Sequence, residues 1–445
     1  MNLDVFKLSK KASEMILSIP KSTRFRVISH YDADGISAAA IICKTLSRQG
    51  YEFHASLMRN PFTKGLERLK NEGNEIIIFT DMGSGQIDMI EQLGCKSIII
   101  DHHQYQKNET SKDIIQINAN QCGINGNYEA SGSSLSLSLA KAVDPDNIDL
   151  SDLALIGATG DKQYIGGIRG YNKKILDEAL EKNILIKQIA LKFSHETILD
   201  SIYYSIDPYY SGISGNKDEI ISLMNKLNID YNKKIKDIDK KESKKINSYL
   251  LLKLIKQGCE NNILDTVIRE RYSSKTYNCE LERFADLLDS CGKGGNRGLG
   301  LAICLGDKKS FNEAINLEKN YKKEILKELI NLEQNGFLEK NNYKYFYSKK
   351  SSIGGVIGGI AMNYLLTNEK PLFSIVKKDN ELHISCRGTQ SLVAKGLDLG
   401  SAMKKAAIEL EGNGGGHKIA AGATIQAEKE NDFLELTDKI ISKQN

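Results

Sequence analysis

Short apolar runs alternate with segments of helical spacing over residues 1–195 of the chain. The runs at residues 26–29, 75–80 and 98–100 have the length and composition of buried strands. The first two precede segments whose apolar positions recur at helical intervals, such as residues 36–48. Such alternation is typical of βα units, so the pattern predicts a parallel sheet with covering helices.

The pattern changes after residue 195. Residues 217–256 carry eleven lysines and six acidic residues, with apolar positions at helical intervals. A solvated helical face explains this charge as readily as a basic binding patch does. Residues 311–332 also have helical spacing, residues 352–360 are rich in glycine, and the alternation at residues 383–386 predicts a strand. We therefore expect three regions, with boundaries at 1–195, 196–345 and 346–445.

Composition narrows the class of protein. Lys and Arg number 61 against 57 for Asp and Glu, so the formal charge of +4 does not by itself indicate a nucleic-acid binder. The eight cysteines include no CxxC pair, which is typical of reduced thiols in the cytosol. No apolar run reaches the length of about 18 residues that a membrane helix requires. We expect a soluble, cytoplasmic protein that does not associate with membranes.

Acidic residues follow the apolar runs in a repeated way. Asp32 and Asp34 follow the first run, Asp81 the second, Asp101 the third, and Asp161 closes a fourth run at residues 153–160. A single such residue is usually a helix cap or a turn residue. Four such segments together, two of them with His, favour a metal site, because the carboxyl ends of parallel strands converge on one crevice. Carboxylate and imidazole ligands suit Mn²⁺ or Mg²⁺.

These motifs resemble a known family. The sequences HYDADG (30–35), TDMG (80–83), DHH (101–103) and ATGD (158–161) resemble the four motifs of DHH-type phosphoesterases. The glycine-rich stretch 412–423 looks like the signature of the DHH-associated domain. Further similarities to that domain and to archaeal RecJ-like nucleases lie at residues 385–388 and 289–307, respectively. The resemblance implies an α/β fold with a parallel-sheet DHH catalytic domain (1–195), a largely helical insertion (196–345) and a smaller α/β DHH-associated domain (346–445).

The resemblance also implies roles for individual residues. Asp81 would bridge two divalent metal ions, with Mn²⁺ preferred and Mg²⁺ as the alternative. The other expected metal ligands are Asp34, His102 and Asp161 for one ion and His30 and Asp32 for the second. Asp101 would orient a neighbouring imidazole, because ligating histidines commonly need a supporting carboxylate. His103 would face the scissile phosphate.

A second site is expected near the C-terminus. Gly414, Gly415 and Gly416 let backbone N–H groups approach an anion, His417 adds a donor, and Arg387 offers a planar fork for a phosphate. Beside a DHH domain, this set is expected to bind the end of a nucleic-acid strand.

Three functions remain open at this point. The first is a RecJ-like, metal-dependent exonuclease that removes nucleotides from single-stranded DNA or RNA in replication, repair or RNA processing. The second is a phosphodiesterase of short oligonucleotides or cyclic dinucleotides, although the long insertion argues against it. The third is a replisome scaffold that binds the GINS complex, with residues 196–345 as the candidate GINS-facing surface. Lys293 and Arg297 could also contact nucleic acid, or their segment could form a turn packed between domains.

Overall fold

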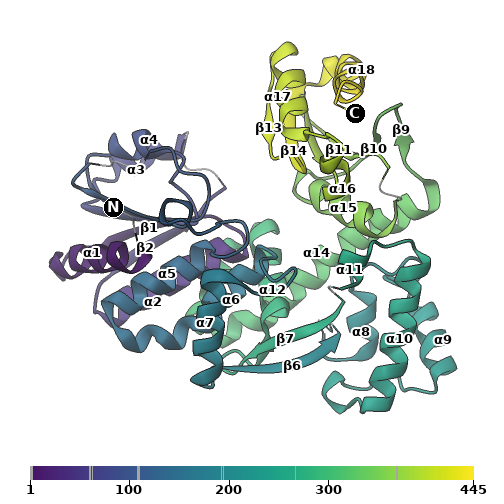
Figure 1. Cartoon of the computed structure of the whole chain (residues 1–445), viewed down its shortest axis with the longest axis horizontal. Coiled ribbons are helices and arrows are strands. Elements are labelled where there is room, and N and C mark those ends of the chain that lie inside the picture. Colours follow the sequence, from purple (N-terminus) through teal and green to yellow (C-terminus); the bar gives the residue numbers. More distant parts are fainter. Residues whose placement is uncertain are drawn as a thin grey trace. The chain divides into compact units, whose positions relative to one another are not determined.

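The computed structural model describes residues 4–444, apart from 60, 61, 63, 108–110, 192, 194, 266, 367 and 368. The chain forms two compact units, and each is discontinuous in sequence (Figure 1). The first unit comprises Met1–Ala190 and Glu270–Glu318, and the second comprises Leu191–Arg269 and Lys319–Asn445.

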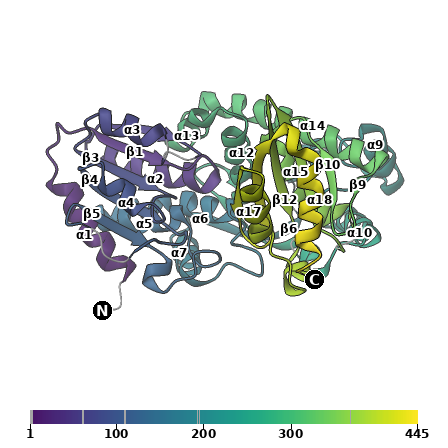
Figure 2. The same cartoon turned by 90° about the horizontal axis from the view of Figure 1, so that it is seen from above.

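A five-stranded parallel sheet forms the centre of the first unit, with the strand order β2-β1-β3-β4-β5 (Figure 2). Its strands are β1 (Phe25–Ser29), β2 (Phe53–Leu57), β3 (Ile76–Thr80), β4 (Lys96–Asp101) and β5 (Ile114–Asn118). The residues of β1, β3 and β5 are all buried, because helices cover both faces of the sheet. The strands predicted at residues 26–29, 75–80 and 98–100 are confirmed as β1, β3 and β4.

The two faces of the sheet carry different sets of helices. The larger core lies on the side of α1 (Val5–Ser18), α2 (Ala33–Arg48), α5 (Gly132–Val143) and α6 (Ser151–Gly160). A smaller core, which includes Ile77 and Phe79, lies on the side of the short helices α3 (Lys64–Asn71) and α4 (Ile87–Glu91). Neighbouring residues of each strand enter opposite cores, as the pleat of a strand requires.

The expectation that Asp161, like the other acidic residues, follows a strand is wrong. The apolar run at residues 153–160 forms helix α6, and Asp161 lies at the end of that helix. Residues 151–159 are all buried, because α6 packs against α2, α5 and α12 (Leu281–Lys293). A helix that is covered on all sides has no polar face, so its sequence is as apolar as that of a buried strand.

The expected boundaries at 195 and 345 differ from those of the two units. Helices α12 and α13 (Arg297–Leu305) pack on α2, and therefore residues 270–318 belong with the sheet of the first unit. Helix α7 (Gly170–Glu181) follows α6 in the sequence. A separate three-stranded sheet consists of β6 (Leu185–Leu191), β7 (Ile268–Ser274) and β8 (Cys279–Glu280). The long helix α14 (Lys308–Asn335) begins in the first unit and ends in the second.

The second unit contains a helical part and a mixed sheet, and the two share one core. The helical part includes α8 (Ile198–Tyr203), α9 (Lys217–Leu227), α10 (Lys240–Lys256) and α11 (Asn261–Leu264). The sheet has the order β13-β14-β12-β11-β10-β9, and only β10 and β11 pair in parallel. This is the α/β C-terminal region that the sequence predicts, with the strand at 383–386 confirmed inside β12.

The strands of this sheet are β9 (Leu338–Glu339), β10 (Lys344–Tyr347), β11 (Leu372–Lys378), β12 (Glu381–Arg387), β13 (Asn413–Gly416) and β14 (Ala420–Gln426). Its helices are α15 (Ser351–Tyr364), α16 (Gln390–Ala394), α17 (Leu399–Glu409) and α18 (Glu430–Ile441). The glycine-rich stretch at 352–360 forms α15, which packs on β11 and β12. Among the residues that the structure describes, no helix combines the length and the hydropathy needed to cross a bilayer.

Candidate metal centre

The acidic and histidine side chains expected to bind metal gather at one edge of the first unit's sheet. The loop after β1 supplies two of them, the first turn of α2 supplies Asp34, and the residues directly after β3, β4 and α6 supply the others. They form three groups whose ligand atoms lie within 4.8 Å of one another: His30 with Asp32 and Asp81, Asp34 with His102 and Asp161, and Asp81 with His102 and His103. Asp81 and His102 each belong to two groups, so the three groups form one continuous cluster.

Asp81 lies at the centre of this cluster. Its Oδ1 atom is 3.1 Å from Nε2 of His102, and its Oδ2 atom is 3.5 Å from Nδ1 of His30. The backbone of Asp81 is left-handed, with φ of 56°, and its N–H group donates to the carbonyl of Ile100 at 2.8 Å. Burial alone would raise the pKa of Asp81, but the contacts with His102 and His30 hold this pKa well below its usual range. The carboxylate is thus ionised, with one oxygen toward each imidazole.

His102 has a fixed tautomer. Its Nδ1 atom lies 2.6 Å from the carbonyl oxygen of Gly126, which can only accept a hydrogen bond. Nδ1 therefore carries a proton, and Nε2 faces carboxylate oxygens of Asp81 and Asp161, 3.1 and 3.3 Å away. A proton or a cation between Nε2 and these oxygens would offset the negative charge of the carboxylates. Burial lowers the pKa of His102, but the surrounding carboxylates outweigh burial and raise it.

Two buried carboxylate oxygens of this cluster have no hydrogen-bond partner among the residues that the structure describes. They are Oδ1 of Asp81 and Oδ2 of Asp161, the two oxygens nearest to Nε2 of His102. An unsatisfied buried charge costs several kcal/mol, so native proteins rarely retain one without a ligand. Hard oxygen donors combined with imidazole nitrogen match the preferences of Mn²⁺ and Mg²⁺. The residues of this cluster therefore fit divalent cations.

Asp34 is held by the first turn of α5. Its Oδ2 atom accepts from the backbone N–H of Gly132 at 2.7 Å, and its Oδ1 atom accepts from that of Ser133 at 3.0 Å. The Ser133 hydroxyl lies 2.5 Å from the same Oδ1 atom. Burial, followed by the charge of Asp81, raises the pKa of Asp34 to about 6. The backbone donors at the start of a helix offset part of this penalty and fix the orientation of the carboxylate.

Asp101 and His103 form a pair beside the cluster. Oδ1 of Asp101 lies 2.7 Å from Nδ1 of His103, and its Oδ2 atom accepts from the backbone N–H of Ser84 at 2.9 Å. Both oxygens of Asp101 are therefore engaged. The side chain of His103 is 56% exposed, so its other ring nitrogen is accessible to a ligand. The contact expected between Asp101 and a neighbouring histidine is present.

The residues expected to bind substrate lie in the second unit. Arg387 ends β12 and Gly416 ends β13, and they pair with Ala420 and Ala421 of the intervening strand β14. Gly414, Gly415 and Gly416 form most of β13, and His417 follows it. Both strand ends therefore lie at the same edge of the sheet.

The guanidinium group of Arg387 donates to the carbonyl of Cys386 at 2.9 Å, and it has no carboxylate partner among the residues that the structure describes. It lies beside Gly355 of α15, where an added Cβ would be 2.9 Å from Nη2. Its charge is thus available to an anion.

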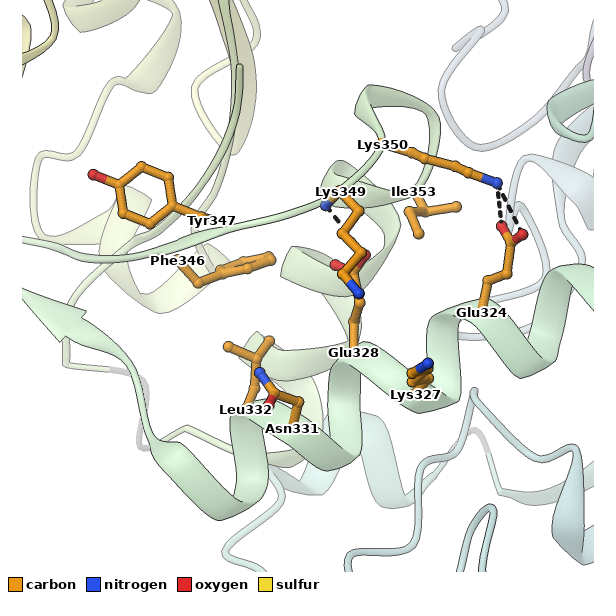
Figure 3. A pocket seen from close by; sticks show the side chains of 10 residues that line it. All are labelled: Glu324, Lys327, Glu328, Asn331, Leu332, Phe346, Tyr347, Lys349, Lys350 and Ile353. Atoms are coloured by element: carbon orange, nitrogen blue, oxygen red, sulfur yellow. Dashed lines mark hydrogen bonds and ion pairs between the residues drawn. The ribbon is translucent and has the colours of Figure 1, made fainter. Parts of the chain in front are cut away.

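A cleft of about 340 Å³ lies elsewhere in the second unit, between α14 and β10 (Figure 3). Its acidic residues are engaged internally: Glu324 pairs with Lys350 at 2.8 Å, and Glu328 accepts from the Ser348 hydroxyl at 2.7 Å. None of the candidate site residues lines this cleft. It therefore belongs to neither predicted site.

Two contacts of the metal centre escaped sequence reasoning. Ser131 caps α5, and its neighbours Gly132 and Ser133 donate backbone hydrogen bonds to Asp34. The Ser and Gly residues before this apolar helix are a signal in the sequence for such backbone contacts. The carbonyl of Gly126, which fixes the tautomer of His102, has no signal in the sequence, because any residue supplies a carbonyl.

The segment at 289–300 packs inside the first unit and is not a turn between domains. Gly292 lies in α12, and Arg297 begins α13. The guanidinium of Arg297 lies 4.8 Å from the ring centre of Tyr31 and donates to the carbonyl of Leu57 at 3.1 Å. This segment therefore contacts the loop that carries His30 and Asp32.

Comparison with known families agrees with this architecture. The sequence model of the DHH family N-terminal domain matches residues 24–158, that of the DHHA1 domain matches residues 342–443, and that of archaeal Cdc45 matches residues 170–289. An uncharacterized protein from Methanocaldococcus jannaschii is 31% identical over 99% of this chain and 98% of its own length.

Solved structures give the same fold. RecJ from Thermus thermophilus, in complex with Mn²⁺, aligns with a TM-score of 0.62 at 16% identity. The alignment covers 100% of this chain but only 55% of that RecJ chain. CDC45 from Entamoeba histolytica aligns with a TM-score of 0.68 at 13% identity, over 99% of this chain and 100% of its own. The family matches show that the chain is a DHH family protein with a DHHA1 domain, and the solved structures show that it shares the fold of RecJ and CDC45.

Gly157 of α6 provides a test of this geometry. A Cβ at this position would lie 2.1 Å from the Ser133 hydroxyl oxygen and 2.4 Å from Oδ1 of Asp34. We expect Gly157→Ala to lower the free energy of unfolding by about 1–3 kcal/mol, as overpacking does, although alanine favours helices. The same variant should bind Mn²⁺ more weakly, because Asp34 must move.

Gly298→Ala is the matched control, since Gly298 lies in α13 and its added Cβ meets no atom within 4 Å. It should increase stability by roughly 0.5–1 kcal/mol. Chemical denaturation and calorimetric titration with Mn²⁺ measure both effects. Equal behaviour of the two variants would contradict the packing of Asp34 described above.

Proposed function

We propose that this protein is a metal-dependent phosphodiesterase that hydrolyses single-stranded nucleic acid from one end. The observation that carries the proposal is the buried carboxylate of Asp81, which directs one oxygen at His102 and the other at His30. A carboxylate in this arrangement suits a bridging position between two divalent ions. Membership of a phosphoesterase family supports hydrolysis of a phosphoester bond.

The ligand sets follow from the three groups of side chains. Asp34, His102 and Asp161 would hold one ion, His30 and Asp32 the other, and Asp81 would contact both. Mn²⁺ is the proposed preferred ion and Mg²⁺ the alternative, and the structurally similar RecJ has been solved in complex with each of these two ions. Two such ions neutralise the charge of a phosphate and lower the pKa of water, which favours in-line hydrolysis.

His103 would bind the substrate phosphate. Oδ1 of Asp101 lies 2.7 Å from Nδ1 of His103, and this contact orients the ring so that Nε2 can face a phosphate oxygen. Asp101 thus fixes the direction of the second ring nitrogen. Both residues would thus act on the substrate side of the cluster.

The second unit would hold the end of the strand. Arg387 offers a charge without a carboxylate partner among the described residues, and Gly414, Gly415 and Gly416 expose backbone near His417. Planar guanidinium groups bind phosphate in a bidentate manner. A separate anion site of this kind favours removal of terminal nucleotides over cleavage within a strand.

The central test uses single-stranded DNA and RNA of graded length, labelled at the 5′ or the 3′ end, with Mn²⁺ or Mg²⁺. We expect a ladder of products from one end for the wild type. Asp81→Ala should reduce the rate by roughly 1,000-fold, because the charge stabilisation by metal ions is worth several kcal/mol. Asp177→Ala removes an exposed carboxylate of α7 and should retain activity.

The outcomes separate the alternatives. Full activity of Asp81→Ala would contradict the assignment of the metal centre. Products formed only from dinucleotides or cyclic dinucleotides would identify a phosphodiesterase of small substrates. Cleavage within long strands would contradict the proposed role of the second unit.

A second role as a replisome partner is favoured by a separate observation. Residues 170–289 match the archaeal Cdc45 family, and they include an exposed apolar face on α10. Tyr249, Leu252 and Ile255 are 38%, 56% and 50% exposed, and the same face carries Lys241 and Lys245. We propose that this face, within the expected GINS-facing region, binds an acidic amphipathic segment of GINS. Aliphatic residues offer little to nucleic-acid bases, so a protein partner is favoured.

Charge introduced into this face tests the proposal. Leu252→Asp should weaken binding to purified GINS by roughly tenfold or more, as loss of a central apolar contact does. Ile408→Asp is the control, because Ile408 is a 64% exposed residue of α17, outside this face. Titration calorimetry measures both affinities. Equal binding by Leu252→Asp and the wild type would exclude the α10 face as the GINS surface.

A further inference from the structure

Asp289 of helix α12 contacts the backbone of the loop that carries the metal ligands. Its Oδ1 atom accepts a hydrogen bond from the backbone N–H of Ala33 at 2.9 Å, across 256 residues of sequence. Ala33 is the first residue of α2 and lies between Asp32 and Asp34. The contact thus reaches the peptide group that links Asp32 to Ala33, next to Asp34.

The packing around this contact is close. An added Cβ at Gly292, one turn after Asp289, would lie 1.8 Å from the carbonyl oxygen of Tyr31. An added Cβ at Gly160 would lie 2.6 Å from the Cβ of Ala33. The backbone around Ala33 is therefore confined between the end of α12 and the end of α6, with glycine at both contacts.

The first N–H groups of a helix lack partners within the helix. In α2, the Asp32 side chain accepts from Gly35 N–H at 3.0 Å, and the Asp289 side chain accepts from Ala33 N–H. Ala33 is buried, at 1% exposure, so water is a poor substitute for Asp289. Without this acceptor, the Asp32–Ala33 peptide could rotate and displace the carboxylates on either side.

We propose that Asp289 is a positioning residue of the metal centre, which sets the orientation of Asp32 and Asp34 through the Ala33 peptide. The inference rests on the proposed metal function of that cluster. The second oxygen of Asp289 pairs with Lys293, one turn further along α12. Lys293 already compensates the charge of Asp289. The proposed role therefore depends on the length of the Asp289 side chain and on the direction in which its oxygen meets the Ala33 N–H group.

Three substitutions separate position from charge. Asp289→Asn keeps the length and a carbonyl acceptor but removes the charge. Asp289→Glu keeps the charge but shifts the acceptor by one methylene group, and Asp289→Ala removes the acceptor. Mn²⁺ alone is titrated into each full-length variant by calorimetry, and thermal unfolding with EDTA checks the fold.

We expect Asp289→Asn to bind Mn²⁺ within about threefold of the wild type. Asp289→Glu and Asp289→Ala should bind roughly tenfold or more weakly, the range typical of residues that support metal ligands. Wild-type affinity in both of these variants would overturn the inference. So would normal binding by Asp289→Glu together with weak binding by Asp289→Asn, since charge would then be the cause. If Asp289→Ala does not fold, the comparison of Mn²⁺ binding by Asp289→Asn and Asp289→Glu tests the inference.

The wild-type titration separates this inference from the proposed function. No Mn²⁺ binding by the wild type would contradict the metal centre itself. Binding by the wild type and equally by all three variants would contradict only the role of Asp289.

Discussion

Four carboxylates and three imidazoles share one largely buried cluster, and the repulsion among the carboxylates is the constraint that shapes this part of the molecule. Asp34 and Asp81 are fully or almost fully buried, and both lie near Nε2 of His102. Cations among these groups would remove the repulsion and satisfy the unpartnered oxygens of Asp81 and Asp161. The remaining contacts hold the ligands in place against this repulsion.

Three helices hold the cluster. The start of α5 donates to Asp34, and the end of α6 carries Asp161. The end of α12 packs on the loop after β1 and accepts from Ala33. Glycines at 157, 160 and 292 stand where these elements approach one another more closely than a Cβ allows. The site thus depends on close helix packing as much as on the sheet whose strand ends carry Asp81 and His102.

Sequence reasoning reached the sheet and the ligand candidates, because both leave local signals. Strands such as β3 are uninterrupted apolar runs, and Asp81 follows its strand directly. The helix α6 could not be predicted, because its residues are covered on all sides and its sequence therefore lacks the polar positions that reveal a helical period. Contacts also could not be predicted where the partner is a backbone atom or is remote in sequence. The Gly126 carbonyl and the contact from Asp289 to Ala33 are set by tertiary packing alone.

Anomalous diffraction from crystals of the wild-type protein grown with Mn²⁺ tests the central claim most directly. We predict two manganese peaks about 3.5–4 Å apart, the usual spacing of two-metal phosphoesterase centres. One peak should lie among Asp34, His102 and Asp161, the other beside His30 and Asp32, with Asp81 in contact with both. The absence of manganese at Asp81, or a single ion bound away from this cluster, would contradict the claim.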